Sequence, residues 1–182
     1  MLVRPGRPED ADAIAALHAA SWSHAYRGIM SDTYLDGPIG AERQALWRKR
    51  LAEPSAQRIL MLGEDDGRLI AFACIFLDHD PQWGALVDNL HVAPGAHGIG
   101  LGRTIFHAAA MAMPESHVAK PIHLTVFTAN MKARGFYERV GGRAVEAMHL
   151  PQPDGQTLPV LRYAWPTVDA LRQGTAARTA VA

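Results

Sequence analysis

Residues Leu90–Arg103 read Leu-His-Val-Ala-Pro-Gly-Ala-His-Gly-Ile-Gly-Leu-Gly-Arg and carry the strongest structural signal in the chain. The segment Ala85–Val92 has the apolar character of a strand that ends inside this stretch. Glycines at alternating positions then lead into Gly98–Met113, which we expect to be a helix stopped by Pro114. Glycine lets the backbone approach a ligand closely, and the first-turn N–H groups of a helix have no partner within the helix. Since the helix dipole adds partial positive charge there, the pattern predicts a site for a phosphate or pyrophosphate.

Two common phosphate-binding motifs do not fit this loop. A P-loop needs Gly-Lys-Ser/Thr, which is absent. A dinucleotide fingerprint needs Gly-x-Gly-x-x-Gly, but counting from Gly98 places Arg103 at the third glycine, and counting from Gly100 places Ile105 there. From this segment alone, a glycine-rich connection without any ligand also stays open.

The rest of the chain alternates between helical and extended periodicity. Helical spacing covers the segments from about Pro8 to residue 22, Ala41–Ala52, Gly98–Met113 and Met131–Val140. Extended character covers Leu2–Arg4, Arg58–Leu62, Leu69–Phe76, Ala85–Val92, Ile122–Phe127, Arg143–Leu150 and Val160–Trp165. Because this order contains both hairpins and crossovers, it predicts an α/β (α+β) fold with a mixed sheet and helices on both faces. We expect one domain over residues 1–166 and a poorly ordered tail over residues 167–182.

Composition excludes several classes of partner. Lys plus Arg and Asp plus Glu each number 18, so the formal net charge is zero. This balance argues against nucleic-acid binding and against a polybasic membrane anchor. The single cysteine, Cys74, lies in an apolar run and is expected to be a core residue rather than a catalytic thiol. Because we find neither a signal peptide nor a spanning segment, we expect a cytoplasmic protein without a membrane partner.

Two segments carry a resemblance to a known family. Val92-x-Pro94 with the histidine and glycines up to Arg103 resembles the pyrophosphate-binding motif of the GCN5-related N-acetyltransferases, the GNAT superfamily. Thr125–Gly142, with Asn130 and a Phe-Tyr pair, resembles the second acetyl-CoA-binding segment of that family. The resemblance covers residues 2 to about 165 and implies the GNAT fold, a mostly antiparallel mixed sheet of about seven strands. It also implies acetyl transfer from acetyl-CoA, as co-substrate, to a primary amine by direct attack in a ternary complex, without a metal.

The resemblance also assigns the residues that bind acetyl-CoA. They are Leu90, His91, Val92, His97, Gly98, Ile99, Gly100, Leu101, Gly102, Arg103, Asn130, Ala133, Phe136 and Tyr137. The family usually has Arg or Gln where this chain has His97. A histidine has a reference pKa of about 6.5 and is largely neutral at pH 7. We therefore expect the backbone N–H groups of Gly98–Gly102, with or without Arg103, to hold the pyrophosphate.

Acetyl transfer needs a neutral amine and a thiolate that can leave. An alkylamine with a pKa of about 10.4 is neutral in about 1 molecule in 2,500 at pH 7, so a base or a desolvating site is useful. The resemblance makes Tyr137 the general acid that protonates the thiolate; a packed aromatic beside Phe136 is its structural alternative. We expect Asn130 to cap the following helix and, by resemblance, to bond the pantetheine arm. A backbone N–H on the Leu90–Val92 strand is expected to face the acetyl oxygen.

The general base is left open by the sequence. Leu86 stands where many family members have a glutamate. Asp88 and His91 lie on the same expected strand, and because their positions differ by three, strand alternation sends them to opposite faces, Asp88 with Leu86 and Leu90. Asp88, directly or through water, or His91 could be the base; the third alternative is an amine that arrives neutral.

The acceptor is the least determined part of the prediction. Ser21–Gly28 resembles a segment that borders the acceptor site in a subset of the family, so Trp22 and Tyr26 are substrate-lining candidates, with core packing as the alternative. The acceptor is expected to be a small-molecule or peptide amine, and a homodimer is common in the family. Two other functions stay open: a CoA-binding sensor or interaction module that has lost catalysis, and a transferase of another acyl group.

Overall fold

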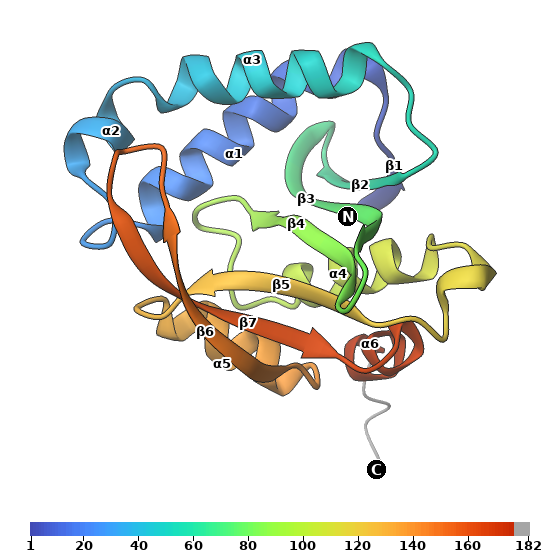
Figure 1. Ribbon diagram of the computed structural model, residues 1–182. Coiled ribbons are helices and arrows are strands. Elements are labelled where there is room, and N and C mark those ends of the chain that lie inside the picture. The colour runs from blue at the N-terminus through green and yellow to red at the C-terminus, as the bar shows by residue number, and fades with distance from the viewer. Residues whose placement is uncertain (177–182) are drawn as a thin grey trace.

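The computed structural model describes residues 1–176, which form a seven-stranded sheet with helices on both faces (Figure 1). The strands are β1 (Leu2–Pro5), β2 (Arg58–Asp65), β3 (Arg68–Asp80), β4 (Gly84–Val92), β5 (Ile122–Phe127), β6 (Arg143–Pro151) and β7 (Thr157–Trp165). The helices are α1 (Ala11–Ala25), α2 (Asp32–Asp36), α3 (Ile39–Ala52), α4 (Leu101–Met111), α5 (Met131–Arg139) and α6 (Val168–Thr175), with 3-10 turns at Pro8–Asp10 and Glu115–His117. The order of the longer elements agrees with the sequence prediction.

The strand order is β1-β2-β3-β4-β5-β7-β6, and β4 with β5 is the parallel pair among antiparallel neighbours. This confirms the predicted mixed, mostly antiparallel sheet. The parallel pairing is short, because β4 and β5 are in register only at Ala85 with Ile122 and at Leu86 with His123. Beyond these pairs the two strands separate toward their carboxyl ends. The sheet therefore opens in its middle, between two strands that each keep a partner on the outer side.

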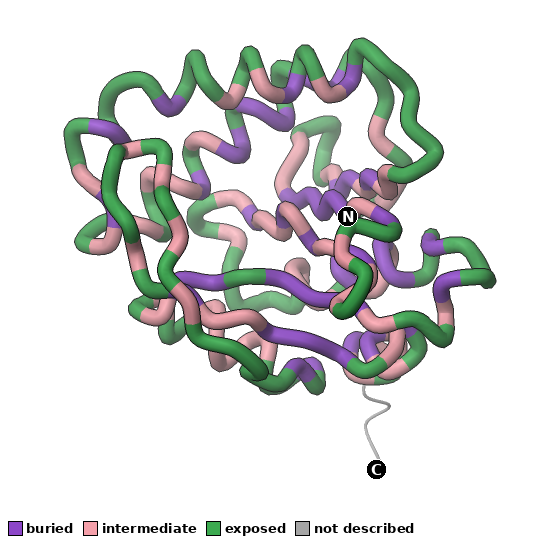
Figure 2. The backbone as a smooth tube through the Cα atoms, in the orientation of Figure 1, coloured by how far each residue is buried: buried purple, intermediate pink, exposed green. Residues whose placement is uncertain are grey.

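Each face of the sheet has its own apolar core, and β3 shows how the sequence alternates between them. Ala71, Ala73 and Ile75 pack in the core under α4, α5 and α6. Phe72 and Cys74 pack in the core under α1 and α3. Figure 2 shows the resulting buried interior along the central strands. Cys74 is a free, buried thiol whose pKa burial raises to about 12, which confirms the predicted core role.

The prediction of a poorly ordered tail after residue 166 is wrong for α6. Thr167 caps this helix through its hydroxyl, which accepts from the N–H of Ala170 at 3.0 Å. Val168 and Leu171 are fully buried against the core under α4. The Nε of Arg172 donates to the carbonyl of Ala110 at 3.0 Å, so α6 also satisfies the end of α4. The rest of the predicted tail, residues 177–182, lies outside the described residues.

Two further features of the described residues are the apolar length of their helices and the grouping of their metal-binding side chains. Within residues 1–176, no helix is both long and apolar enough to span a bilayer. In the same residues, no group of three or more His, Cys, Asp or Glu side chains is placed to hold a metal ion.

Candidate active site

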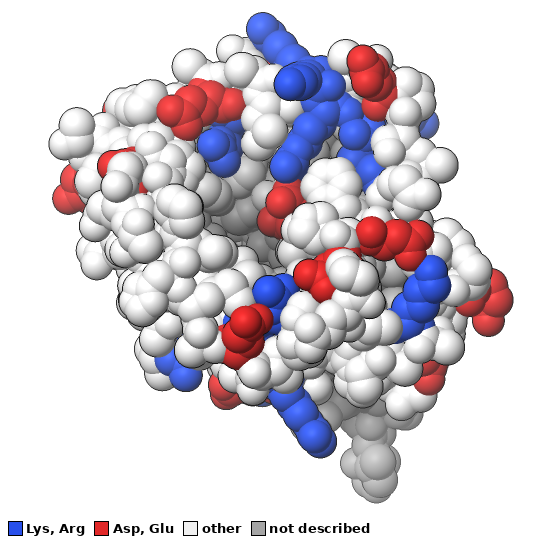
Figure 3. Space-filling model, in the orientation of Figure 1, with Lys and Arg blue, Asp and Glu red and all other residues white. Residues whose placement is uncertain are grey.

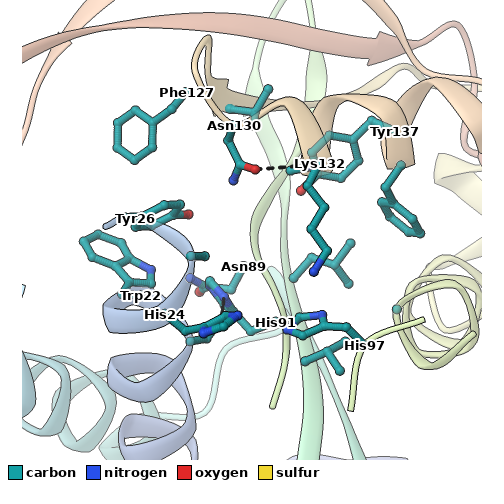
Figure 4. A pocket seen from close by; sticks show the side chains of 18 of the residues that line it. Trp22, His24, Tyr26, Asn89, His91, His97, Phe127, Asn130, Lys132 and Tyr137 are labelled. Carbon is teal, nitrogen blue, oxygen red and sulfur yellow. Dashed lines mark hydrogen bonds between the residues drawn. The ribbon is translucent and has the colours of Figure 1, made fainter. Parts of the chain in front are cut away.

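A cavity of about 860 Å³ lies where β4 and β5 separate. Its walls come from the second half of β4, the loop before α4, the start of α5, the end of α1 and the hairpin of β6 and β7. Figure 4 shows side chains from α1, β4 and α5 pointing into this space. Every residue predicted to bind acetyl-CoA lines the cavity except Ile99, a residue that is 75% exposed.

The loop before α4 has the conformation that its glycines allow. Gly95, Gly98 and Gly100 have φ values of +86°, +89° and +89°, which L side chains rarely adopt. Gly100 directly precedes α4, whose N-terminus has no side-chain cap. The first helical bond is donated by the N–H of Thr104 to the carbonyl of Gly100 at 3.0 Å. The N–H groups of the preceding first turn are therefore available to an anion, as the sequence predicts.

The ionisable side chains of this loop are engaged with the protein. Nη1 of Arg103 donates to the carbonyl of Ala176 at 3.3 Å, which ties the guanidinium to the end of α6. His97 stacks on His24 of α1, with ring centroids 6.0 Å apart and an angle of 18° between the planes. Burial lowers the pKa of His97, and the charges of Lys132 and His24 lower it further. His97 is thus held neutral, and the loop offers an anion mainly backbone amides.

Helix α5 brings the second predicted segment to the same cavity. Asn130 caps the helix, with Oδ1 accepting from the N–H of Ala133 at 3.1 Å, as the sequence predicts. The Tyr137 ring packs beside Phe136, Tyr163 and Trp165, and it also lines the cavity. Burial raises the pKa of the Tyr137 hydroxyl, so this group is protonated at neutral pH. The sequence left open whether Tyr137 is a packed aromatic or a residue of the active site. In the structure its ring is packed and it also lines the cavity.

A bulge in β4 corrects the predicted placement of Asp88 and His91. Cys74 pairs with Asn89 while its neighbour Ile75 pairs with Val87, so Asp88 is an extra residue in β4. The inserted residue shifts the alternation by one position. As a result Asp88 and His91 both face α1 and α3, whereas Leu90 packs in the opposite core. The prediction that Asp88 and His91 lie on opposite faces, with Leu90 beside Asp88, is wrong for this reason.

His91 is held as a neutral imidazole. Its Nδ1 shares a hydrogen bond with the hydroxyl of Ser21 at 3.0 Å, and its ring lies 4.6 Å from the ring of His18. Burial lowers the pKa of His91 to about 3, with a further contribution from the charge of Arg43. A group with this pKa is a weak proton acceptor at neutral pH.

Asp88 is held by an ion pair. Its Oδ2 accepts from Nη1 of Arg50 at 2.6 Å, and the same Nη1 donates to Oδ1 of Asn89 at 3.2 Å. The Asp88 side chain is 26% exposed and lines the cavity. Among residues 1–176, its Oδ1 has no hydrogen-bond partner, so one carboxylate oxygen is free to meet a ligand.

The backbone of β4 supplies two further donors. The N–H of Ala93 donates to the carbonyl of Ile70 on β3 at 2.8 Å. Because amides alternate between the two edges of a strand, the N–H groups of Leu90 and Val92 point away from β3. That edge faces β5, which has already separated from β4. The opening of the sheet therefore exposes the strand amides that the sequence predicts near the acetyl oxygen.

The predicted acceptor candidates lie on the other side of the cavity. Trp22 and Tyr26 line it and meet edge to face, with centroids 5.2 Å apart, and Tyr26 meets Phe127 in the same way at 4.9 Å. Both side chains also pack on the small core around Met30 and Tyr34. Burial raises the pKa of Tyr26 to about 12.

Several residues of the site were missed by sequence reasoning. They are Ser21, His24, Ala25, Asn89, Ala96, Thr125, Val126, Phe127, Lys132, Arg139, Val140, Leu150, Pro151, Gln152 and Val160. Lys132 stands two residues after Asn130 within the recognised segment, so its position offered a signal. The hairpin residues offered none, because they reach the cavity only through tertiary packing.

Comparison with known proteins agrees with this geometry. Residues 17–142 match the sequence profile of the acetyltransferase (GNAT) family, and this chain belongs to that family. A probable N-acetyltransferase of Mycobacterium tuberculosis is 29% identical over 140 residues, which are 75% of this chain and 76% of that protein.

Solved structures share the fold at low identity. The PaiA N-acetyltransferase of Thermoplasma acidophilum, in complex with coenzyme A, has a TM-score of 0.70 at 17% identity, over 90% of this chain and 98% of that one. The putative acetyltransferase YncA of Salmonella typhimurium, with acetyl-CoA, has a TM-score of 0.66 at 17% identity, over 93% and 94% of the two chains. The GNAT fold and the acetyltransferase class predicted from the motifs are confirmed.

Proposed function

We propose that this protein transfers the acetyl group of acetyl-CoA to a primary amine of a small molecule or peptide, by direct attack in a ternary complex. One observation carries the proposal: a single cavity connects the free amides of the glycine loop with the hydroxyl of Tyr137. The coenzyme A and acetyl-CoA bound to structures of the same fold support the choice of cofactor.

The cofactor is proposed to follow the opened edge of β4. Its pyrophosphate lies on the first-turn amides of α4, and Lys132, whose side chain extends toward His97 (Figure 4), supplies the positive charge that His97 lacks. Its pantetheine arm runs between the separated strands, where it bonds the free backbone groups of β4 and the amide of Asn130. This path brings the thioester to the amides of Leu90 and Val92.

Two groups of this chain act on the thioester: a backbone amide of β4 and the hydroxyl of Tyr137. The amine nitrogen attacks the thioester carbon, and a β4 amide donates to the oxygen that becomes negative. When the tetrahedral intermediate collapses, the carbon–sulfur bond breaks and the thiolate takes the proton of Tyr137. Burial raises the pKa of Tyr137, so the hydroxyl carries its proton when the thiolate forms, and the resulting tyrosinate regains a proton from solvent before the next turnover.

The amine also loses a proton in the reaction. We assign its acceptance to Asp88, directly or through water, because Asp88 lines the cavity and its Oδ1 has no hydrogen-bond partner among residues 1–176. His91, with a pKa of about 3, stays neutral and offers the amine a hydrogen bond rather than a sink for its proton.

The test measures time-dependent release of free thiol from acetyl-CoA with a panel of primary amines. We expect release that needs both protein and amine and falls strongly in Tyr137→Phe. Coenzyme A binding by calorimetry without amine-dependent release would instead identify a binding module. Faster release from propionyl-CoA or a longer acyl-CoA would identify a transferase of another acyl group.

A further inference from the structure

We propose that the acceptor is a primary amine with one positive charge and an aromatic body, whose ring packs against Trp22, Tyr26 and Phe127. This inference rests on the proposed function, because it names the second substrate of the same cavity. It follows from the distribution of charge and of aromatic rings along the cavity wall.

The charge of the wall excludes acceptors with several ammonium groups. Among the residues of 1–176 that line the cavity, Asp88 is the only acidic one. Asp88 already pairs with Arg50, which leaves a single oxygen for a ligand. A polyamine or an aminoglycoside would therefore bring cations into a site that can partner one of them, and each unpartnered charge costs free energy to desolvate. The cavity wall therefore offers an acidic partner to a single ammonium group, at Asp88.

The body of the acceptor meets a different kind of wall. Trp22 from α1, Tyr26 at the end of α1 and Phe127 at the end of β5 form a continuous series of edge-to-face rings. Leu150, Pro151 and Val160 extend this apolar side from the hairpin of β6 and β7. Figure 3 shows that the surface is hollowed between the helices and the sheet, with uncharged side chains along the left border of the hollow and charged ones along its right border. A ring added to such a series gains about 0.5–1.5 kcal/mol beyond its buried area.

The charged end and the aromatic wall lie on the same side of the sheet. The bulge turns Asp88 toward α1 and α3, and Trp22 and Tyr26 come from α1 and its C-terminus. The carboxylate and the rings therefore line one cavity on the same side of the sheet, and a single acceptor is proposed to contact both. The opposite side of the cavity is occupied by the proposed cofactor path along the glycine loop and α5.

The test compares 2-phenylethylamine, 2-cyclohexylethylamine, spermidine and a lysine-containing peptide as acceptors in the thiol-release assay. We expect kcat/KM for 2-phenylethylamine to exceed that for spermidine by about tenfold or more, and to exceed that for the cyclohexyl analogue of equal size severalfold. Equal or higher kcat/KM for spermidine or the peptide overturns the inference, as does the absence of a preference between the two rings.

A pair of matched variants separates the aromatic wall from general stability. Trp22→Leu should raise the KM for 2-phenylethylamine about fivefold to tenfold, with an unchanged KM for acetyl-CoA. Trp83→Leu is the control, since Trp83 lies outside the cavity wall but also has an arginine over its ring, Arg162 at 5.4 Å, as Trp22 has Arg43 at 4.7 Å. Equal effects of the two substitutions would contradict the inference.

Direct binding keeps this inference distinct from the proposed function. Binding of 2-phenylethylamine is followed by calorimetry with and without coenzyme A. Failure of coenzyme A to bind contradicts the proposed function, while loss of amine binding in Trp22→Leu still supports the aromatic site. Coenzyme A binding without any binding of 2-phenylethylamine contradicts the inference alone.

Discussion

The two sides of the cavity are built from different parts of the chain. The side proposed for the cofactor consists largely of backbone groups, the amides of the glycine loop and of β4, fixed by positive φ angles and by the Asn130 cap. The side proposed for the acceptor consists of side chains from α1, β5 and the β6–β7 hairpin. Backbone groups are the same in every protein and suit a common cofactor. Side chains can change without disturbing the fold, which suits an acceptor that differs between relatives.

The strongest test of this contrast is Tyr137→Phe, which removes one oxygen from the cofactor side. We expect kcat to fall about 100-fold or more, because general acid catalysis contributes about 10²–10⁴ in rate. Coenzyme A affinity should stay within a factor of about two, since the ring still packs on Phe136. Steady-state kinetics and calorimetry provide the two values.

Tyr163→Phe is the matched control for that variant. Tyr163 lies 5.9 Å from the ring of Tyr137, but its hydroxyl donates to Glu138 at 2.6 Å. Loss of this hydrogen bond should lower the free energy of unfolding by about 1 kcal/mol and leave kcat unchanged. A similar fall of kcat in both variants would show that Tyr137 acts through packing.

The acceptor side can be probed through the pH dependence of stability. His91 has a pKa of about 3 in the folded protein and about 6.5 when unfolded. The unfolded chain therefore binds the additional proton between these values, so stability is fully present above about pH 6.5 and falls as the pH is lowered. Protonation of His91 in the unfolded chain lowers the free energy of unfolding by about 2 kcal/mol as the pH falls from 7.5 to 5. Denaturant unfolding should show that His91→Gln reduces the acid loss by that amount, and an unaltered slope would contradict the assignment.

Gly100→Ala tests whether backbone conformation carries the cofactor side. A Cβ at Gly100 meets no atom within 4 Å, so the φ of +89° is the only obstacle. A non-glycine residue in this region costs about 1–2 kcal/mol, so the free loop should relax to another conformation. Coenzyme A must then restore the positive φ on binding, which predicts about a tenfold weaker affinity.

Gly102→Ala is the control within the same loop. Gly102 has a helical conformation, and its Cβ would lie 3.7 Å from Val92 and 3.8 Å from Phe136, ordinary contact distances. Because Gly102 also lies in the proposed pyrophosphate site, calorimetry should find coenzyme A affinity weakened clearly less than in Gly100→Ala. If Gly102→Ala weakened binding as much as Gly100→Ala, crowding rather than backbone conformation would explain the loss.

The smallest effect is expected at Lys132, the cation proposed to face the pyrophosphate on the cofactor side. Lys132→Gln should raise the KM for acetyl-CoA about threefold at low salt, and the difference should disappear as salt screens the charge. Lys120→Gln serves as the control because Lys120 pairs with Asp78 at 2.8 Å, outside the cavity wall. A salt-independent loss at Lys132 would point to a packing role.

The cofactor side and the sheet could be predicted because their signals are local. The glycines fix a loop conformation, Asn130 marks a helix start, and strand periodicity defines β2 to β5. The bulge at Asp88 could not be predicted, because Asp88 looks like any other strand residue until β3 pairs with β4. The helix α6 was missed because Val168 and Leu171 are few apolar residues in an Ala-rich and Thr-rich segment, and the bonds from Arg172 to α4 span the sequence. The aromatic wall joins segments more than 100 residues apart, from Trp22 to Phe127.

The extra residue in β4 makes the length of this strand as important as its composition. Deleting one residue near Asp88 would leave every hydrophobic residue in the sequence but would exchange the two faces of the strand on one side of the deletion. His91 would then turn into the core under α4, or Val87 would turn out of it. A one-residue deletion at this point should thus be far more damaging than most substitutions. Designed chimeras that join β4 of one relative to the loop of another must count residues from the bulge, not from the glycine motif.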